Sequence, residues 1–201
     1  MNLNLPRSKR VLTMFIIFLG LTALIAWVIQ NPARAEEFAS ISVLNEKMMA
    51  SNYYPGNTTL VPENTLLSWN IQVYNHLGSI QLMLVIARLS NATLSEPNAT
   101  YNLPGSGFPI ANFTKLVLSN ETWTIPLQWE IVNDTTGSAA SIQVMRVNNQ
   151  TVYPNLPSVS GKNFRVEIEL WTYDVEIQDF LFSFHTDHRV SSVWNQVWFN
   201  I

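Results

Sequence analysis

The chain has 201 residues and a formal net charge of −3 at pH 7, and it contains no cysteine, which excludes disulfides, thiol catalysis and cysteine-ligated metals. Four of its eleven Lys and Arg precede residue 36, which leaves seven basic against fourteen acidic side chains in the remainder. A field of this sign repels phosphate backbones, so we expect no nucleic-acid partner.

The first expected element is a membrane-spanning helix. Residues 11–30 contain no charged side chain and consist mainly of Leu, Ile, Phe, Val and Ala. A helix of about 20 residues, at about 1.5 Å per residue, matches the roughly 30 Å hydrocarbon core of a membrane. Arg7, Lys9 and Arg10 precede this run, and that bias predicts a cytoplasmic N-terminus at residues 1–10. We therefore expect a single-pass protein of the cell membrane with residues 36–201 outside the cell.

The same segment has a second interpretation, a cleaved signal peptide. Ala33-Arg34-Ala35 fits the small-x-small pattern that precedes a cleavage site. The apolar run is longer than the roughly 7–15 residues of a signal-peptide core, which favours a retained signal anchor. Both alternatives leave residues 36–201 outside the membrane.

Residues 36–201 are expected to form β-strands, because apolar and polar residues alternate along several runs. Residues 79–89 are instead apolar on both faces, as in a central strand that is covered on each side. The other strand candidates are 39–44, 68–74, 115–118, 122–131, 141–147, 163–173, 180–184 and a run that ends at residue 201. The inward-facing sets are Trp123, Ile125, Leu127, Trp129 and Ile131 in one run and Phe164, Val166, Ile168 and Leu170 in another.

These strands predict an all-β fold, a single antiparallel immunoglobulin- or fibronectin-like β-sandwich, preceded by the one transmembrane helix. Pro126 has no N–H, so its strand is expected at a sheet edge or with a bulge. Residues 91–111 are expected to form a long loop. Residues 190–201 fit both an amphipathic helix and a strand, and their β-branched and aromatic content favours the strand.

Seven Asn-x-Thr triplets lie beyond residue 56, where random placement would give about one or two. Such triplets are glycosylated only where a glycosyltransferase meets them, on the outer face of a membrane. An Asn- and Thr-rich β-protein that forms triplets by accident in its turns is the alternative. The sequence predicts N-linked glycans on Asn57, Asn91, Asn98, Asn112, Asn120, Asn133 and Asn149.

One cluster has residue types that suit a metal ion. His185, Asp187 and His188 would supply two imidazoles and a carboxylate to zinc or copper. The alternative is a polar hairpin turn between two strands.

Paired carboxylates are the catalytic groups of glycosidases, and Glu167 and Glu169 share one face of a strand beside Arg165. At an offset of two residues we expect them to form a solvated face instead. The sequence contains no nucleophile elbow and no phosphate-binding loop. We therefore expect no enzyme activity and no cofactor.

Three short motifs carry a family resemblance. They are Asn75-His76-Leu77-Gly78 at the end of a strand, Leu118-Ser119-Asn120-Glu121-Thr122-Trp123, and the closing Val197-Trp198-Phe199-Asn200-Ile201. Together they resemble an archaeal family of membrane-anchored proteins known only as domain of unknown function 1616. The resemblance spans residues 39–201 and implies an archaeal surface β-sandwich, without implying an activity.

These features predict a non-enzymatic surface domain that acts as an accessory or structural subunit. Its expected partners are the membrane and other envelope proteins, in a membrane complex or in the surface layer. The alternative is a metal- or ligand-binding surface domain that uses His185, Asp187 and His188. A hydrolase of surface glycans ranks third.

Overall fold

The structure of the chain is a computed structural model that describes residues 7–30, 36–135, 140–158, 162–186 and 189–201. The chain divides into two compact units, Met1–Glu36 and Glu37–Ile201. Each unit is described by itself.

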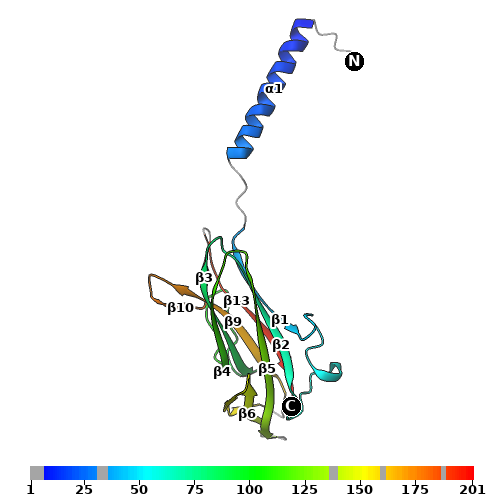
Figure 1. The fold of residues 1–201 in the computed structure, drawn as a ribbon, viewed down its shortest axis with the longest axis vertical. Coiled ribbons are helices and arrows are strands. Elements are labelled where there is room, and N and C mark those ends of the chain that lie inside the picture. The colour runs from blue at the N-terminus through cyan, green and yellow to red at the C-terminus, as the bar shows by residue number, and fades with distance from the viewer. Residues whose placement is uncertain (1–6, 31–35, 136–139, 159–161, 187–188) are drawn as a thin grey trace. The chain divides into compact units, whose positions relative to one another are not determined.

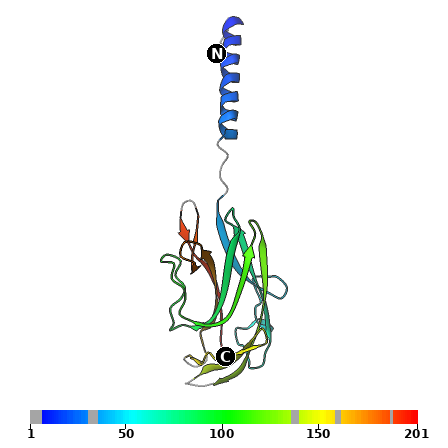
Figure 2. The same cartoon turned by 60° about the vertical axis from the view of Figure 1, so that its left-hand side comes forward.

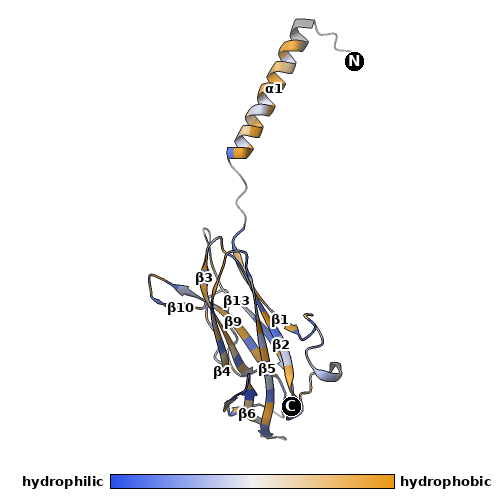
Figure 3. Ribbon diagram, viewed as in Figure 1, coloured by the Kyte–Doolittle hydropathy of each residue, from blue (hydrophilic) through white to orange (hydrophobic). Residues whose placement is uncertain are grey.

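The first unit contains helix α1, Arg7–Gln30 (Figure 1). Hydrophobic residues predominate in α1 between its two ends, whereas in the second unit they alternate with hydrophilic ones (Figure 3). Within α1, the stretch Val11–Gln30 is apolar enough and long enough to cross a membrane, and none of its residues is buried. A signal sequence near the N-terminus has the same properties. The expected apolar helix is therefore present, in a form that fits both the anchor and the signal peptide.

The second unit is built from antiparallel β-strands that run lengthwise along it (Figures 1 and 2). The first sheet has the order β1 (Phe38–Asn45), β2 (Leu67–His76), β5 (Thr122–Thr135), β6 (Ser141–Val147) and β7 (Gln150–Val152), and β8 (Leu156–Pro157) also pairs with β6. The second sheet has the order β10 (Asp179–Leu181), β9 (Phe164–Asp174), β3 (Gln81–Asn91) and β4 (Phe108–Val117), and β13 (Val193–Phe199) also pairs with β9. A small ladder joins β11 (Phe184–His185) to β12 (Val190–Ser191), and η1 (Pro55–Asn57) is a single 3-10 turn.

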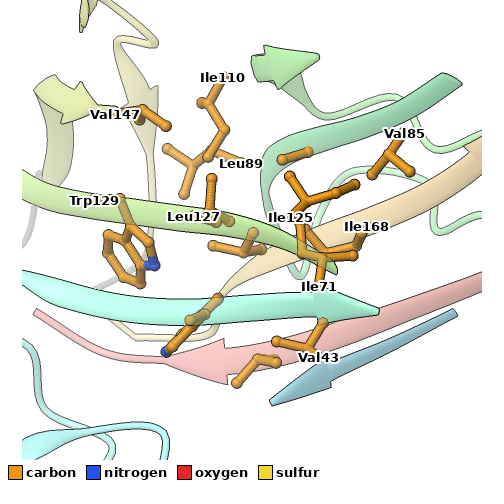
Figure 4. Close-up of a cluster of buried hydrophobic side chains, with 14 of the residues drawn as sticks. Val43, Ile71, Val85, Leu89, Ile110, Ile125, Leu127, Trp129, Val147 and Ile168 are labelled. Atoms are coloured by element: carbon orange, nitrogen blue, oxygen red, sulfur yellow. The ribbon is translucent and has the colours of Figure 1, made fainter. Parts of the chain in front are cut away.

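Side chains of both sheets meet in one hydrophobic core (Figure 4). The inward faces predicted for two strands are confirmed: Ile125, Leu127, Trp129 and Ile131 of β5 and Phe164, Val166, Ile168 and Leu170 of β9 are buried, whereas Trp123 is half-buried. One part of the core is a cluster of aromatic rings. The ring of Trp129 lies 5.1 Å from the ring of Trp69 on β2 and 5.2 Å from the ring of Phe199 on β13. Such pairs add stability beyond the area that they bury.

Two adjacent tyrosines in the β1–β2 connection tie an outer strand of one sheet to an outer strand of the other. The hydroxyl of Tyr53 donates a hydrogen bond to the carbonyl of Val43 on β1, at 2.9 Å. The hydroxyl of Tyr54 donates to the carbonyl of Trp198 on β13, also at 2.9 Å. Since β1 and β13 are not hydrogen-bonded to each other, these phenols link the two layers along that side.

The long strands lie where the sequence predicts them, except for the first half of β4, whereas β7 and β8 are not predicted and the run 180–184 is divided between β10 and β11. Strand β4 begins at Phe108, so the connection expected at residues 91–111 is confined to residues 92–107. The C-terminal run is a strand, as favoured. β5 as a whole is not an edge strand, because it lies between β2 and β6, but Pro126 itself is paired only with β2. The ladder between β5 and β6 begins only at Trp129. The nitrogen of Pro126 faces the side of β5 that β6 does not reach, so the missing N–H costs no hydrogen bond between strands.

Replacing Trp129 with Ala removes the ring at the centre of the aromatic cluster. We expect a loss of about 3–5 kcal/mol in the free energy of unfolding, because the cavity is surrounded by both sheets. Chemical denaturation of residues 37–201 measures this loss. The matched control is Tyr153→Ala at an exposed position, which should change little. An equal loss in the two variants would contradict the shared core.

Candidate functional site

Five of the predicted glycosylation sites are exposed. Asn98, Asn112, Asn120, Asn133 and Asn149 all have exposed side chains. They lie respectively in the β3–β4 connection, on β4, in the β4–β5 turn, on β5 and in the β6–β7 turn. The backbone of Asn57 belongs to η1, and its side chain lies outside the described part of the structure.

Asn91 differs from these five because its side chain is only 3% exposed. Its amide nitrogen Nδ2, the atom to which an N-linked sugar attaches, donates to the carbonyl of Pro157 at 2.6 Å. Its Oδ1 accepts from the backbone N–H groups of Thr93 and Leu94, at 2.9 and 3.1 Å. The side chain therefore closes the turn after β3, and the fold leaves no room for a sugar there.

The histidine cluster is only partly described. His185 is exposed at the end of β11, opposite Val190 of β12. Asp187 and His188 lie outside the described residues. The backbone N–H of Thr186 donates to the carbonyl of Arg189, at 2.9 Å, which closes the hairpin between these strands. Within the described ranges, no group of three or more His, Cys, Asp or Glu could hold a metal ion.

The solvated face expected for Glu167 and Glu169 is wrong. Glu167, Glu169 and their neighbour Arg165 are all buried, although they point away from the apolar core. Residues 92–107 connect β3 to β4, and the hydrogen bonds described next hold this segment against the outer face of β9. We call this segment the cover segment and the charged side chains beneath it the buried charge network.

Glu169 ties the cover segment to the sheet. Its Oε1 accepts from the backbone N–H of Gly105 at 2.6 Å. Its Oε2 accepts from Nε of Arg88 and from the indole N–H of Trp171, both at 3.0 Å. Arg88 also donates to the carbonyl of Gly107 at 3.2 Å. The carboxylate thus has donors from two strands and from the cover segment, which satisfies a buried charge.

Arg165 holds the other end of the cover segment. Its Nε donates to Oε1 of Glu167 at 2.6 Å, and its Nη2 donates to the carbonyl of Leu94 at 3.0 Å. Nη1 lies 3.5 Å from the carboxylate of Glu96. The guanidinium also stacks over the ring of Trp198, 4.9 Å from the ring centroid. Each donor group of this arginine therefore has an acceptor.

Glu167 is less well satisfied. Its Oε2 is buried and has no hydrogen-bond partner. A Cβ added to Gly105 would lie 2.4 Å from that oxygen, so only glycine allows the cover segment to pack so closely here. Burial raises the pKa of the Glu167 carboxyl, and the adjacent Arg165 offsets only part of this rise.

The side chains of the buried charge network are closed off from solvent, and two accessible hollows lie elsewhere. Two hollows of about 310 and 240 Å³ share Asn52, Tyr53 and Tyr54 of the β1–β2 connection. Glu167 and Glu169 line neither of them. The carboxylate pair is therefore placed to hold the cover segment, and its arrangement gives a substrate no access.

Sequence reasoning missed Arg88, Gly105 and Trp171 as partners of these carboxylates. One signal was present: Arg88 is the only charged residue in the apolar run 79–89. A charge in a strand that is covered on both faces calls for a buried counter-charge. Nothing in the sequence indicates the hydrogen bond from the Gly105 N–H to Glu169, because this bond depends on the path of the cover segment.

No protein-family model matches the chain, and neither a curated protein nor a solved structure shows significant similarity to it. The resemblance to the archaeal family therefore stays a prediction.

The raised pKa of Glu167 predicts a specific dependence of stability on pH. Burial favours the protonated form of the Glu167 carboxyl in the folded state. The stabilisation that this carboxyl gives to the fold is therefore fully present when the pH is below the ordinary pKa range of Glu. This contribution is lost as the pH rises through the raised pKa. The free energy of unfolding of the parent chain, relative to that of the Glu167→Gln variant, should therefore fall as the pH rises above the ordinary pKa range of Glu.

Glu121 provides a control of opposite sign. A hydrogen bond from Lys115 and one from the N–H of Leu118 lower the pKa of its carboxyl. The stability of the parent relative to Glu121→Gln should rise with pH over the acidic range. Denaturant titrations at several pH values measure both slopes. A flat or rising profile for Glu167→Gln would contradict the burial of that carboxyl.

Proposed function

We propose that this chain is a membrane-anchored, N-glycosylated surface domain that acts by binding other envelope proteins, as an accessory or structural subunit. The observation that carries the proposal is the apolar stretch Val11–Gln30, whose residues are all exposed and which precedes a separate compact β unit in the sequence. A helix that is apolar on every side needs lipid or other apolar helices around it. Lys9 and Arg10 before it support an orientation with the β unit outside.

The strand order supports an immunoglobulin- or fibronectin-like sandwich. In such folds the first, second and fifth strands (A, B and E) share one sheet, and strands C, F and G share the other. Here β1, β2 and β5 are neighbours in the first sheet, and β4, β3, β9 and β13 are neighbours in the second. They correspond to A, B and E and to C′, C, F and G. The chain departs from the pattern after β5, where β6, β7 and β8 extend the first sheet before β9 returns to the second.

The surface supports a role in binding rather than in catalysis. The carboxylates of Glu167 and Glu169 are buried and hold the cover segment on the sheet. The hollows beside Tyr53 and Tyr54 are lined by phenols, amides and hydroxyls, by the charged side chains of Glu46 and Lys47, and by apolar residues. None of these groups is paired as a nucleophile with a base.

Purification of the full chain from native membranes in a mild detergent tests this proposal. We expect a defined assembly in which the chain and at least one other membrane protein are present in fixed stoichiometry. A variant with three Leu→Arg substitutions in α1, at Leu12, Leu19 and Leu24, is the matched control and should lose membrane association. A parent chain that is monomeric in every detergent and soluble without one would contradict the proposal.

Glycan occupancy gives an independent test. Mass spectrometry of the chain from its native membrane should find sugars on the exposed asparagines, such as Asn98, Asn133 and Asn149, and none on Asn91, whose Nδ2 is buried and hydrogen-bonded. Thr135→Ala destroys one triplet and should remove the sugar from Asn133 alone. Modification of Asn91 in the folded protein, or an absence of sugar at every site, would contradict the prediction.

A further inference from the structure

The turn between β9 and β10 displays two apolar side chains. Val175 is 80% exposed and Ile177 is 61% exposed. Tight turns normally carry Gly, Pro, Asn, Asp or Ser, which supply the backbone geometry and face water at no cost. In Figure 1 the β9–β10 hairpin projects from the body of the β unit. The two side chains therefore stand on a projection where packing within the chain does not require them.

Hydrogen bonds within this turn fix the backbone that carries the two side chains. Oδ1 of Asp174 accepts from the backbone N–H groups of Glu176 and Ile177, at 2.8 and 3.0 Å. The carbonyl of Asp174 accepts from the N–H of Gln178, at 2.8 Å. Behind the turn, the ring of Tyr173 packs edge-on against the ring of Phe180, with 5.4 Å between the centroids. A preorganised tip loses little conformational entropy when it binds.

Acidic side chains surround the two apolar ones. Asp174, Glu176 and Asp179 lie within this turn, and residues 166–188 contain no Lys or Arg. Among the described residues, none of the three carboxylates takes part in an ion pair. An acidic rim opposes contact with anionic lipid headgroups. It fits a protein surface in which Lys and Arg surround an apolar hollow.

The hairpin itself carries no glycosylation triplet, because the last Asn-x-Thr triplet in the sequence begins at Asn149. The other exposed apolar residues include Met48, Met49 and Leu60, and these share the β1–β2 connection with the triplet at Asn57. A glycan there would compete with a protein partner for the same surface.

We propose that the β9–β10 hairpin, with Val175 and Ile177 at its tip, docks into an apolar, basic-rimmed hollow on the extracellular part of a second envelope protein. The inference rests on the proposed function and names the surface through which it acts. The apolar tip supplies the buried centre of the contact, and the carboxylates of Glu176 and Asp179 supply its charged rim.

Site-specific photo-crosslinking in native membranes tests this docking surface. The full chain carries a photo-crosslinking residue in place of Val175, or in place of Leu60 or Tyr153 as controls at exposed positions. We expect one discrete protein adduct from position 175, at least about tenfold more abundant than from either control. Adding Glu176→Lys and Asp179→Lys should abolish it without changing the melting temperature, because both side chains are exposed.

The other outcomes separate the two proposals. Adducts from Leu60 or Tyr153 with none from position 175 would overturn the docking surface and leave the proposed function standing. An adduct with lipid, with a second copy of this chain, or with a protein whose capture ignores the charge reversal would also overturn the docking surface. Absence of protein adducts at all three positions, together with a monomeric chain in detergent, would overturn both.

Discussion

Strand β9 is buried on both faces, and the rest of the β unit is arranged around that constraint. Its apolar face packs into the core, while Arg165, Glu167 and Glu169 on the other face are enclosed by the cover segment. Burying a charged group costs several kcal/mol unless ion pairs and hydrogen bonds offset the cost. Removing one partner of such a pair leaves an uncompensated buried charge. The cover segment is therefore an obligatory part of the fold, although it contains almost no regular structure. Gly105 is the point of closest approach, because its N–H reaches Glu169 and a Cβ would meet Glu167.

This arrangement divides the surface by function. Asn91, the last residue of β3 before the cover segment, is a structural residue with both amide atoms in hydrogen bonds, whereas Asn98 within the cover segment is exposed. Two triplets of the same type thus have opposite prospects of carrying a sugar. The hairpin after β9 continues the same strand into a tip without any triplet, where acidic and apolar side chains are exposed together. One strand therefore anchors the cover segment and presents the proposed docking surface.

The sequence predicted what periodicity can encode. Alternation identified the inward faces of β5 and β9, and a run that is apolar on both faces identified β3 as central. Periodicity could not show that the outer face of β9 is covered, because Arg165, Glu167 and Glu169 alternate in the same way as solvated residues do. It also failed at Phe108–Thr114, where Pro109 and the triplet at Asn112 made a strand resemble a loop. Both errors concern long-range contacts of residues 91–111. The triplets identify the asparagines that could carry a glycan. Only the fold shows that Asn91 is buried, unlike the five exposed asparagines.

The most direct test of this account is the hydrogen exchange of the Gly105 amide in the folded chain. Amides of irregular segments normally exchange close to the unprotected rate. The account predicts that the Gly105 N–H is protected about as strongly as the amides of β9, and that Glu169→Gln weakens this protection while the core remains folded. Exchange of Gly105 at the unprotected rate in the parent chain would contradict the claim that buried carboxylates hold the cover segment on the sheet.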